Sequence, residues 1–298
     1  MATDMRVGSL LALVLALMLP TACRKPEKSE AGERPVPTAT RSLLASLPPQ
    51  AGPGPDGYRE ARWGSNSAAA RTALPSRTKI VCGELDPELR ARRNQPPSKD
   101  GRWHELDNLN VPKPGPNEAD FRRAVTALYS AQTDNYYDET DGITTFLATL
   151  WHLNQQHLNL DTDPQAKLFS VARIGPGCGL FFQGRYTAQL NIVLEKLSPE
   201  TVLKSLAESV GPYRKVAEQK SILKNGGGPH EVYGFNGGRT VVLALIGSDR
   251  VATLYMDRER LLRLPKELSE AMNQQQSAAR AAQKQHREKN SARLKDDL

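Results

Sequence analysis

The chain of 298 residues has little of what most recognisable enzymes carry. Aromatic residues make up 6% of it, and its three cysteines form no CxxC pair of the kind that holds zinc. It contains no GxSxG elbow, no Walker loop, no dinucleotide-binding fingerprint and no HExxH motif. These absences argue against the common nucleophilic hydrolases, nucleotide-binding folds and zinc enzymes, so we expect no cofactor and no metal.

Two partial motifs lack the residues that would complete them. His152 and His157 are five residues apart, which on a helix separates them by about 140° and rules out an i, i+4 metal pair. Ser221 and Lys224 match the SxxK spacing of penicillin-binding enzymes, but Gly226–Gly228 follow where the serine should open a long helix. Neither pair identifies a catalytic centre.

Long apolar runs are also scarce, and the clearest one begins near the N-terminus. Arg6 precedes Val7–Pro20, fourteen uncharged and mostly apolar residues, and Thr21, Ala22 and Cys23 follow. A membrane-spanning helix needs about 20 apolar residues, so this run favours a cleaved export signal over a transmembrane anchor. We predict that residues 1–22 are removed.

Residues 1–24 resemble a bacterial lipoprotein signal, in which a diacylglycerol is attached to the cysteine that becomes the mature N-terminus. The resemblance implies lipidation at Cys23, with two or three acyl chains that anchor stably. It departs from the usual pattern at Pro20, because Leu usually stands three residues before the cysteine. A retained membrane anchor and ordinary secretion are the alternatives. An acidic residue after the cysteine often marks inner-membrane retention in this class, so Arg24 favours the outer membrane, facing the periplasm.

Two cysteines remain once Cys23 is assigned to lipid. Cys82 and Cys178 both lie in apolar, glycine-flanked contexts. In an oxidising compartment they are expected to form a disulfide, and two buried or free thiols are the alternative.

Proline content predicts how the rest of the chain is divided. Eight of the 21 prolines lie between Arg24 and Arg77, a density that disfavours helix and sheet. We therefore predict a lipid anchor and disordered linker over 23–77, one globular domain over 78–265 and a charged tail over 266–298. In the tail a heptad-like row fades into Gln and Ala and is interrupted by Pro265, so we expect a frayed, exposed helix rather than a coiled coil.

Positive charge is concentrated in the predicted linker and tail. The formal net charge is +7, yet residues 78–265 carry 23 basic and 22 acidic side chains. A nucleic-acid-reading domain needs Lys and Arg clustered on its folded surface, so we expect no nucleic-acid partner. The basic segments suit an anionic lipid surface or cell wall, and solubility alone is the simpler alternative.

Periodicity within 78–265 predicts an α+β domain, with helices gathered against one face of a mostly antiparallel sheet. Suitable N-caps begin three helices, at Asn117, at Thr140 or Asp141, and at Ser198. A further short helix is expected over 86–93. Strands are expected over the runs 79–84, 168–174, 180–183, 186–194, 232–235, 240–246 and 251–256. In the run 186–194, the side chains of Tyr186, Ala188, Leu190 and Ile192 should face inward, and the intervening polar ones outward.

The segment 134–142 is the most suggestive stretch for ligand binding. It cannot be an EF-hand loop, because two essential oxygen ligands are missing. A looser cation site, a loop that stacks on a sugar or peptide, and an ordinary interhelical loop are the readings left open. The candidate binding residues are Tyr136, Tyr137, Asp138, Glu139 and Asp141.

These features predict a lipid-anchored cell-envelope binding or scaffold protein, for example an inhibitor or assembly factor. Its partners would be the membrane, reached through the lipid, and an envelope protein or cell-wall material. The alternative is an envelope hydrolase that acts on cell-wall glycan with paired carboxylates near residues 138–141. No residue is assigned a catalytic role.

Overall fold

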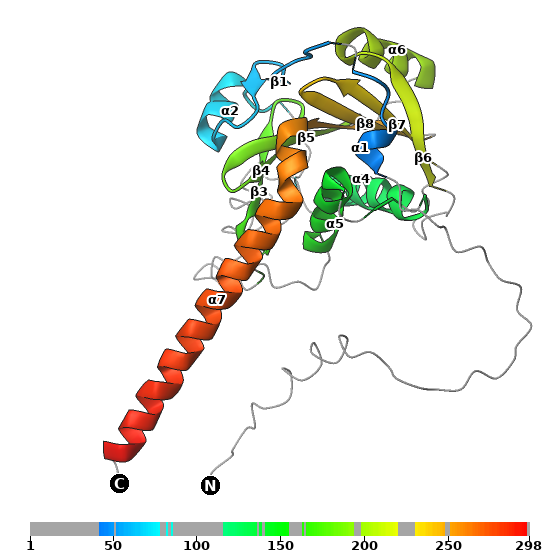
Figure 1. The fold of residues 1–298 in the computed structure, drawn as a ribbon. Coiled ribbons are helices and arrows are strands. Elements are labelled where there is room, and N and C mark those ends of the chain that lie inside the picture. Colours follow the sequence, from blue (N-terminus) through cyan, green and yellow to red (C-terminus); the bar gives the residue numbers. More distant parts are fainter. Residues whose placement is uncertain are drawn as a thin grey trace, which may run out of the picture. The chain divides into compact units, whose positions relative to one another are not determined.

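A seven-stranded antiparallel sheet forms the centre of the fold and confirms the predicted α+β class (Figure 1). The computed structural model describes residues 42–50, 52–77, 82, 85, 116–135, 137–138, 141–154, 163, 165–193, 198–219, 230–247 and 251–296. The strand order is β3-β4-β5-β9-β8-β7-β6. The strands are β3 (Phe169–Ile174), β4 (Gly177–Phe182), β5 (Arg185–Val193), β6 (Tyr213–Gln219), β7 (His230–Gly237), β8 (Thr240–Ile246) and β9 (Val251–Asp257).

Helices and a small hairpin cover both faces of this sheet. The helices are α1 (Leu43–Ser46), α2 (Ser67–Ala73), α4 (Pro116–Thr133), α5 (Gly142–Leu153), α6 (Pro199–Val210) and α7 (Arg258–Asp296), with a 3-10 turn η3 (Gln165–Lys167). The hairpin pairs β1 (Gly57–Tyr58) with β2 (Ala61–Arg62). None of the helices in the described ranges carries an apolar stretch long enough to span a membrane.

The sheet separates two sets of buried side chains. On what we call the first face, α1, α4, α5 and the start of α7 pack on Leu190, Leu243 and Leu254 in the largest core cluster. On the second face, the β1–β2 hairpin and α2 cover β3–β5, while α6 covers β7 and β8. The sheet is therefore buried on both sides, and the expectation that the helices gather against one face is wrong.

Two of the predicted helices begin at the residues that their sequence indicates. Ser198 caps α6 by accepting from the Thr201 amide, and Leu203, Leu206 and Val210 form its buried face. Asp141, one of the two candidate caps, starts α5. The predicted apolar row of α5 is buried as expected: Ile143, Phe146, Leu147 and Leu150.

The expected outward row of β5 is wrong, because this strand lies inside a two-sided sheet. Thr187, Gln189 and Asn191 are buried, not solvated. A β-bulge between β4 and β5 also pairs Phe181 with Tyr186, while Leu180 pairs with Ala188. Tyr186 consequently joins Phe181 in the second-face core, whereas Ala188 lies in the first-face core.

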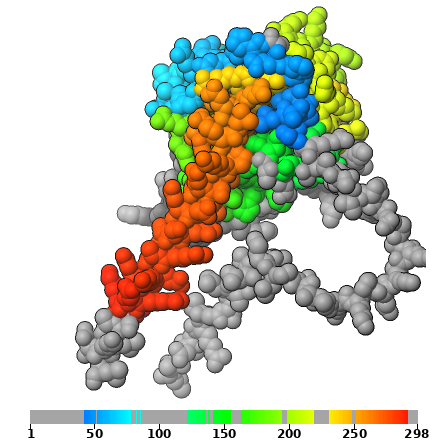
Figure 2. Space-filling model, viewed as in Figure 1, coloured from blue at the N-terminus to red at the C-terminus, as the bar shows by residue number. Residues whose placement is uncertain are grey.

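The predicted boundary at residue 78 is also wrong, since residues 42–50 and 52–77 belong to the folded unit. Leu43 and Leu47 are buried on the first face, and Tyr58 and Trp63 on the second. The described residues of the connection between them, 48–50 and 52–56, are called the strap. In Figure 2 this blue segment lies across the edge of the folded unit beside the orange start of α7.

Proline carbonyls explain how a proline-rich strap is held. Thr240 Oγ1 donates to the Pro55 carbonyl at 2.6 Å, Asn236 Nδ2 donates to Pro48 at 2.9 Å, and the Arg239 amide donates to Pro53. An extended proline-rich segment has no hydrogen bonds of its own, so its carbonyls are available to the β7–β8 turn. The proline content indicated that this segment has few N–H donors, but it did not indicate that the proline carbonyls would accept hydrogen bonds from the domain.

The predicted boundary at residue 265 is wrong as well. Helix α7 begins at Arg258 and passes through Pro265, and Leu261, Leu264 and Leu268 are buried in the first-face core. Pro265 has no N–H to donate to the Leu261 carbonyl. That carbonyl lies against Gly142, where any side chain would overlap it. The expected exposure of the tail is confirmed over 276–290.

Several predictions concern residues that lie outside the described ranges. These are the export signal, Cys23, and the predicted helix at 86–93. Of the predicted strand at 79–84, only Cys82 is described.

Candidate functional site

Asp141, a predicted binding residue, is used inside the fold. One carboxylate oxygen accepts from Ser42 Oγ at 2.6 Å and from the Leu44 amide at 3.1 Å. The other accepts from the amides of Ile143 at 3.0 Å and Thr144 at 3.5 Å. The side chain is 8% exposed. It therefore caps α5 and α1 together.

Tyr137 lies against the edge of the sheet. Its phenol donates to the Val216 carbonyl at 2.6 Å, and Asn135 Nδ2 donates to the Glu218 carbonyl at 3.1 Å. Both carbonyls belong to β6, an edge strand. Edge strands expose unpaired backbone groups that invite aggregation, so these two side chains cover part of that edge. Among the other predicted binding residues, Asp138 is half-buried, and Tyr136 and Glu139 lie outside the described ranges.

Strand β6 and its neighbour β7 together carry a group of exposed and partly exposed polar and aromatic side chains on the second face. We call these residues the edge cluster: Tyr213, Lys215, Glu218, Glu231 and Tyr233. Lys215 Nζ lies 2.5 Å from Glu231 Oε1 and 3.2 Å from Glu218 Oε2. The Tyr233 phenol donates to Glu231 Oε2 at 2.7 Å. Cross-strand pairing of Lys215 with Tyr233 and of Glu218 with Glu231 places the four groups together.

Electrostatics fixes the charge of the edge cluster. The hydrogen bond from Lys215 lowers the pKa of the Glu231 carboxyl, and the same bond raises the pKa of Lys215. Partial burial and the bond to Glu231 raise the pKa of Tyr233. Lys215 and Glu231 are therefore both ionised at neutral pH, and Tyr233 stays a hydrogen-bond donor.

Tyr213 adds an exposed aromatic ring to the edge cluster. It is 44% exposed, and few other large apolar residues in the described ranges are as open. Its ring stands edge-on to Tyr233, with 5.8 Å between centroids, and tilts against the buried Phe235 at 5.4 Å. A supported aromatic ring beside ionised donors and acceptors can stack on a flat apolar surface while binding its polar groups.

Sequence reasoning missed the edge cluster because it did not predict β6. The register of β6 against β7 shifts between Lys215 and Ala217, so the alternation of buried and exposed residues is broken there. Val216 and Ala217 are consecutive and both buried. The usable signal was Gly211 and Pro212, which end α6 and precede a tyrosine.

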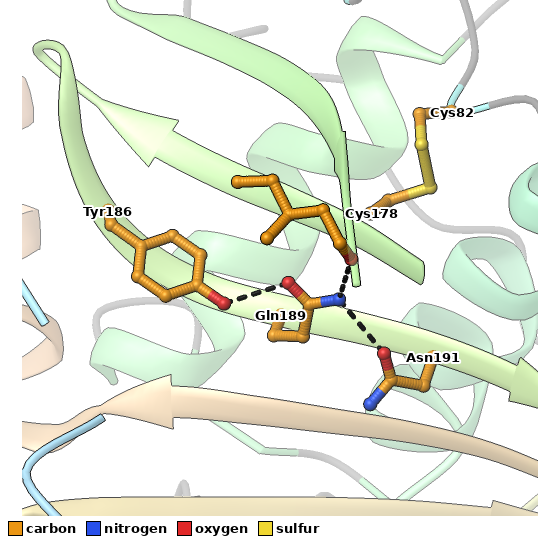
Figure 3. The surroundings of a disulfide bond; sticks show 6 residues. Cys82, Cys178, Tyr186, Gln189 and Asn191 are labelled. Atoms are coloured by element: carbon orange, nitrogen blue, oxygen red, sulfur yellow. Dashed lines mark hydrogen bonds between the residues drawn. A yellow bond between two sulfur atoms is a disulfide. The ribbon is translucent and has the colours of Figure 1, made fainter. Parts of the chain in front are cut away.

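A second polar group lies buried on β5. Tyr186 donates to Gln189 Oε1 at 2.8 Å, and Gln189 Nε2 donates to Asn191 Oδ1 at 2.9 Å and to the Ile174 carbonyl at 3.0 Å. Figure 3 shows these side chains in a row beside the Cys82–Cys178 bond. Burial raises the pKa of Tyr186 well above its ordinary value, and that of Tyr255 to about 12. Both phenols stay protonated, and the Tyr186 phenol serves as a structural donor.

The predicted Cys82–Cys178 disulfide is present, with Cα atoms 5.6 Å apart and a sequence separation of 96. It joins β4 to a segment before α4. The described residues include no group of three His, Cys, Asp or Glu side chains placed to hold a metal ion.

Comparison with protein-family models, curated protein sequences and solved structures finds no match for this chain.

Proposed function

We propose that this chain is an exported lipoprotein of the cell envelope, anchored through Cys23, whose domain binds a cell-wall partner at the edge cluster. The observation that carries the proposed compartment is the Cys82–Cys178 disulfide. Disulfides persist in oxidising compartments such as the periplasm and are rare in the cytosol. The lipoprotein-like signal over residues 1–24 supports the same compartment independently.

The folded strap changes the geometry of the proposed anchor. Residues 24–41 separate Cys23 from Ser42, which is bonded to Asp141. Eighteen residues reach at most about 60 Å, whereas a linker ending at residue 77 could reach about 180 Å. The domain would therefore work close to the membrane surface.

The edge cluster favours a sugar-containing partner within the envelope. Stacking on Tyr213 suits the apolar face of a sugar ring, and Lys215, Glu218 and Glu231 offer donors and acceptors to its polar groups. The hydrolase alternative is supported less well, because the Asp141 carboxylate already accepts from four donors.

Sedimentation with purified, insoluble cell-wall sacculi tests the binding role. We expect the protein to co-sediment, and Tyr213→Ser to lower the bound fraction about 10-fold, as loss of an aromatic interface residue commonly does. Leu262→Ser is the matched control, since Leu262 is also a large exposed apolar residue. No sedimentation, or equal losses in both variants, would contradict binding at the edge cluster.

A further inference from the structure

The distal part of α7 is a helix without a core to pack on. Every side chain from residue 276 to residue 290 is exposed, although α7 runs on to Asp296. At about 1.5 Å per residue, the 39 residues of α7 span about 58 Å. A helix that is polar on all sides needs many internal ion pairs or a partner surface. The i, i+4 ion pair found within 276–290 is Lys284 with Glu288, at 3.9 Å.

Three of the four Lys and Arg residues of 276–290 stand on one side of this distal segment, and the fourth, Lys289, stands on the opposite side. Arg280, Lys284 and Arg287 stand at i, i+4 and i+7, a spacing that places them within about 60° of one another around the helix axis. We call these three residues the basic stripe. It points about 130° away from the buried row of Leu261, Leu264 and Leu268, given 3.6 residues per turn.

The helix dipole does not account for the basic stripe. Favourable interaction with a helix C-terminus falls off within the last turn. Arg287 precedes the final helical residue, Asp296, by nine positions, and Arg280 precedes it by sixteen. Glu288 pairs with Lys284, but the three cations of the stripe outnumber it, so this side of the helix surface keeps a net positive charge.

We propose that the basic stripe binds the anionic surface of the bilayer that carries the lipid anchor. Charge complementarity favours this partner, because anionic headgroups attract clustered Lys and Arg side chains. The distal segment contributes Ala, Gln and Ser where a membrane-inserting helix would carry large apolar residues, so it lies on the headgroups.

The lengths of two segments support the same partner. Residues 24–41, between the anchor and Ser42, reach at most about 60 Å, and α7 is about 58 Å long. The helix can therefore reach the bilayer to which Cys23 would attach. This inference rests on the proposed lipid anchor, because the anchor brings α7 to a membrane.

Vesicle sedimentation separates this inference from the lipid anchor. The chain 24–298, which contains the whole compact unit 39–298, is mixed with vesicles of phosphatidylglycerol and phosphatidylcholine, or of phosphatidylcholine alone. We expect binding to the anionic vesicles, weakened by salt. The triple variant R280Q/K284Q/R287Q should bind them roughly 10- to 100-fold more weakly.

The matched control removes three exposed cations elsewhere, in K204Q/R263Q/K266Q, and should keep most of the binding. Equal losses in both variants, or equal binding to phosphatidylcholine alone, would overturn the proposal. Retention on duplex DNA as strong as on anionic vesicles, and lost in the stripe variant, would assign the stripe to nucleic acid instead. Vesicle binding by a protein that carries no lipid in cells would overturn the proposed function but leave the stripe an anion-binding surface.

Discussion

Asp141 accepts a hydrogen bond from Ser42 Oγ at 2.6 Å, across 99 residues of sequence, while it caps α5. The bond ties a segment expected to be a linker to the helix layer of the domain. It also gives Asp141, a candidate ligand-binding residue in the sequence, a structural role instead.

Replacing Asp141 should therefore destabilise the domain. We expect Asp141→Ala to lower the free energy of unfolding by about 2–4 kcal/mol, since it removes a helix cap and charge-assisted bonds from a buried site. Ser42→Ala should cost about 1 kcal/mol. Urea unfolding of both single variants and the double variant measures the coupling. Additive effects would contradict a direct interaction between the two side chains.

A pair of glycine variants tests whether the strap is packed on the β7–β8 turn. Gly238 has φ +80°, and an added Cβ would lie 2.5 Å from the Gly52 and Pro53 carbonyl oxygens. Gly64 has φ +78°, with open space around it. Gly64→Ala should cost about 1 kcal/mol of backbone strain, and Gly238→Ala about 2–3 kcal/mol, because it also displaces the strap. Equal losses in thermal unfolding would mean that the strap does not lie on the turn.

Breaking the disulfide should weaken the domain strongly. Cys82→Ala/Cys178→Ala is expected to lose about 4 kcal/mol, because the bond closes a loop of 96 residues in the unfolded chain. Reductant should lower the urea midpoint of the parent protein and leave that of the double variant unchanged. A parent midpoint that does not respond to reductant would contradict a closed bond.

The edge cluster should show a measurable pH response at Glu231. Its pKa in the folded protein lies below the ordinary value of 4.5, so the pairing stabilises the fold above that pH and is lost as pH falls through the folded pKa. Lys215, whose pKa is raised above 10.5, loses the pairing only as pH rises through its folded pKa. The gain between these limits is about 1 kcal/mol or less, because both side chains are well solvated.

NMR titration of the Glu231 carboxyl measures this pairing directly. Lys215→Gln should raise the Glu231 pKa toward its ordinary value, whereas Lys204→Gln, an exposed lysine on α6, should leave it unchanged. A Glu231 pKa that ignores Lys215→Gln would show that the two groups do not interact in solution.

Local signals predicted much of the fold. Ser198 with Pro199, and Asp141 with the apolar row after it, define α6 and α5 through caps and periodicity alone. The run Thr240–Ile246 is strand-like in composition and is a strand. Where a segment's own residues decide its conformation, sequence reasoning reached the right element.

The elements that the sequence did not predict are held by contacts between residues far apart in the chain. The strap is held by donors from Asn236, Arg239 and Thr240, which no local pattern connects to prolines more than 180 residues away. Pro265 stays within α7 although proline usually ends a helix. The edge cluster depends on a register shift in β6, and only the paired strand reveals it.

Mass spectrometry of the mature N-terminus most directly tests the central claim that this domain is tethered by lipid. Protein purified from bacterial membranes should begin at Cys23 and carry the mass of a diacylglycerol on its thiol, and Cys23→Ala should lack that mass. An unmodified Cys23 within an intact N-terminal segment would contradict the account.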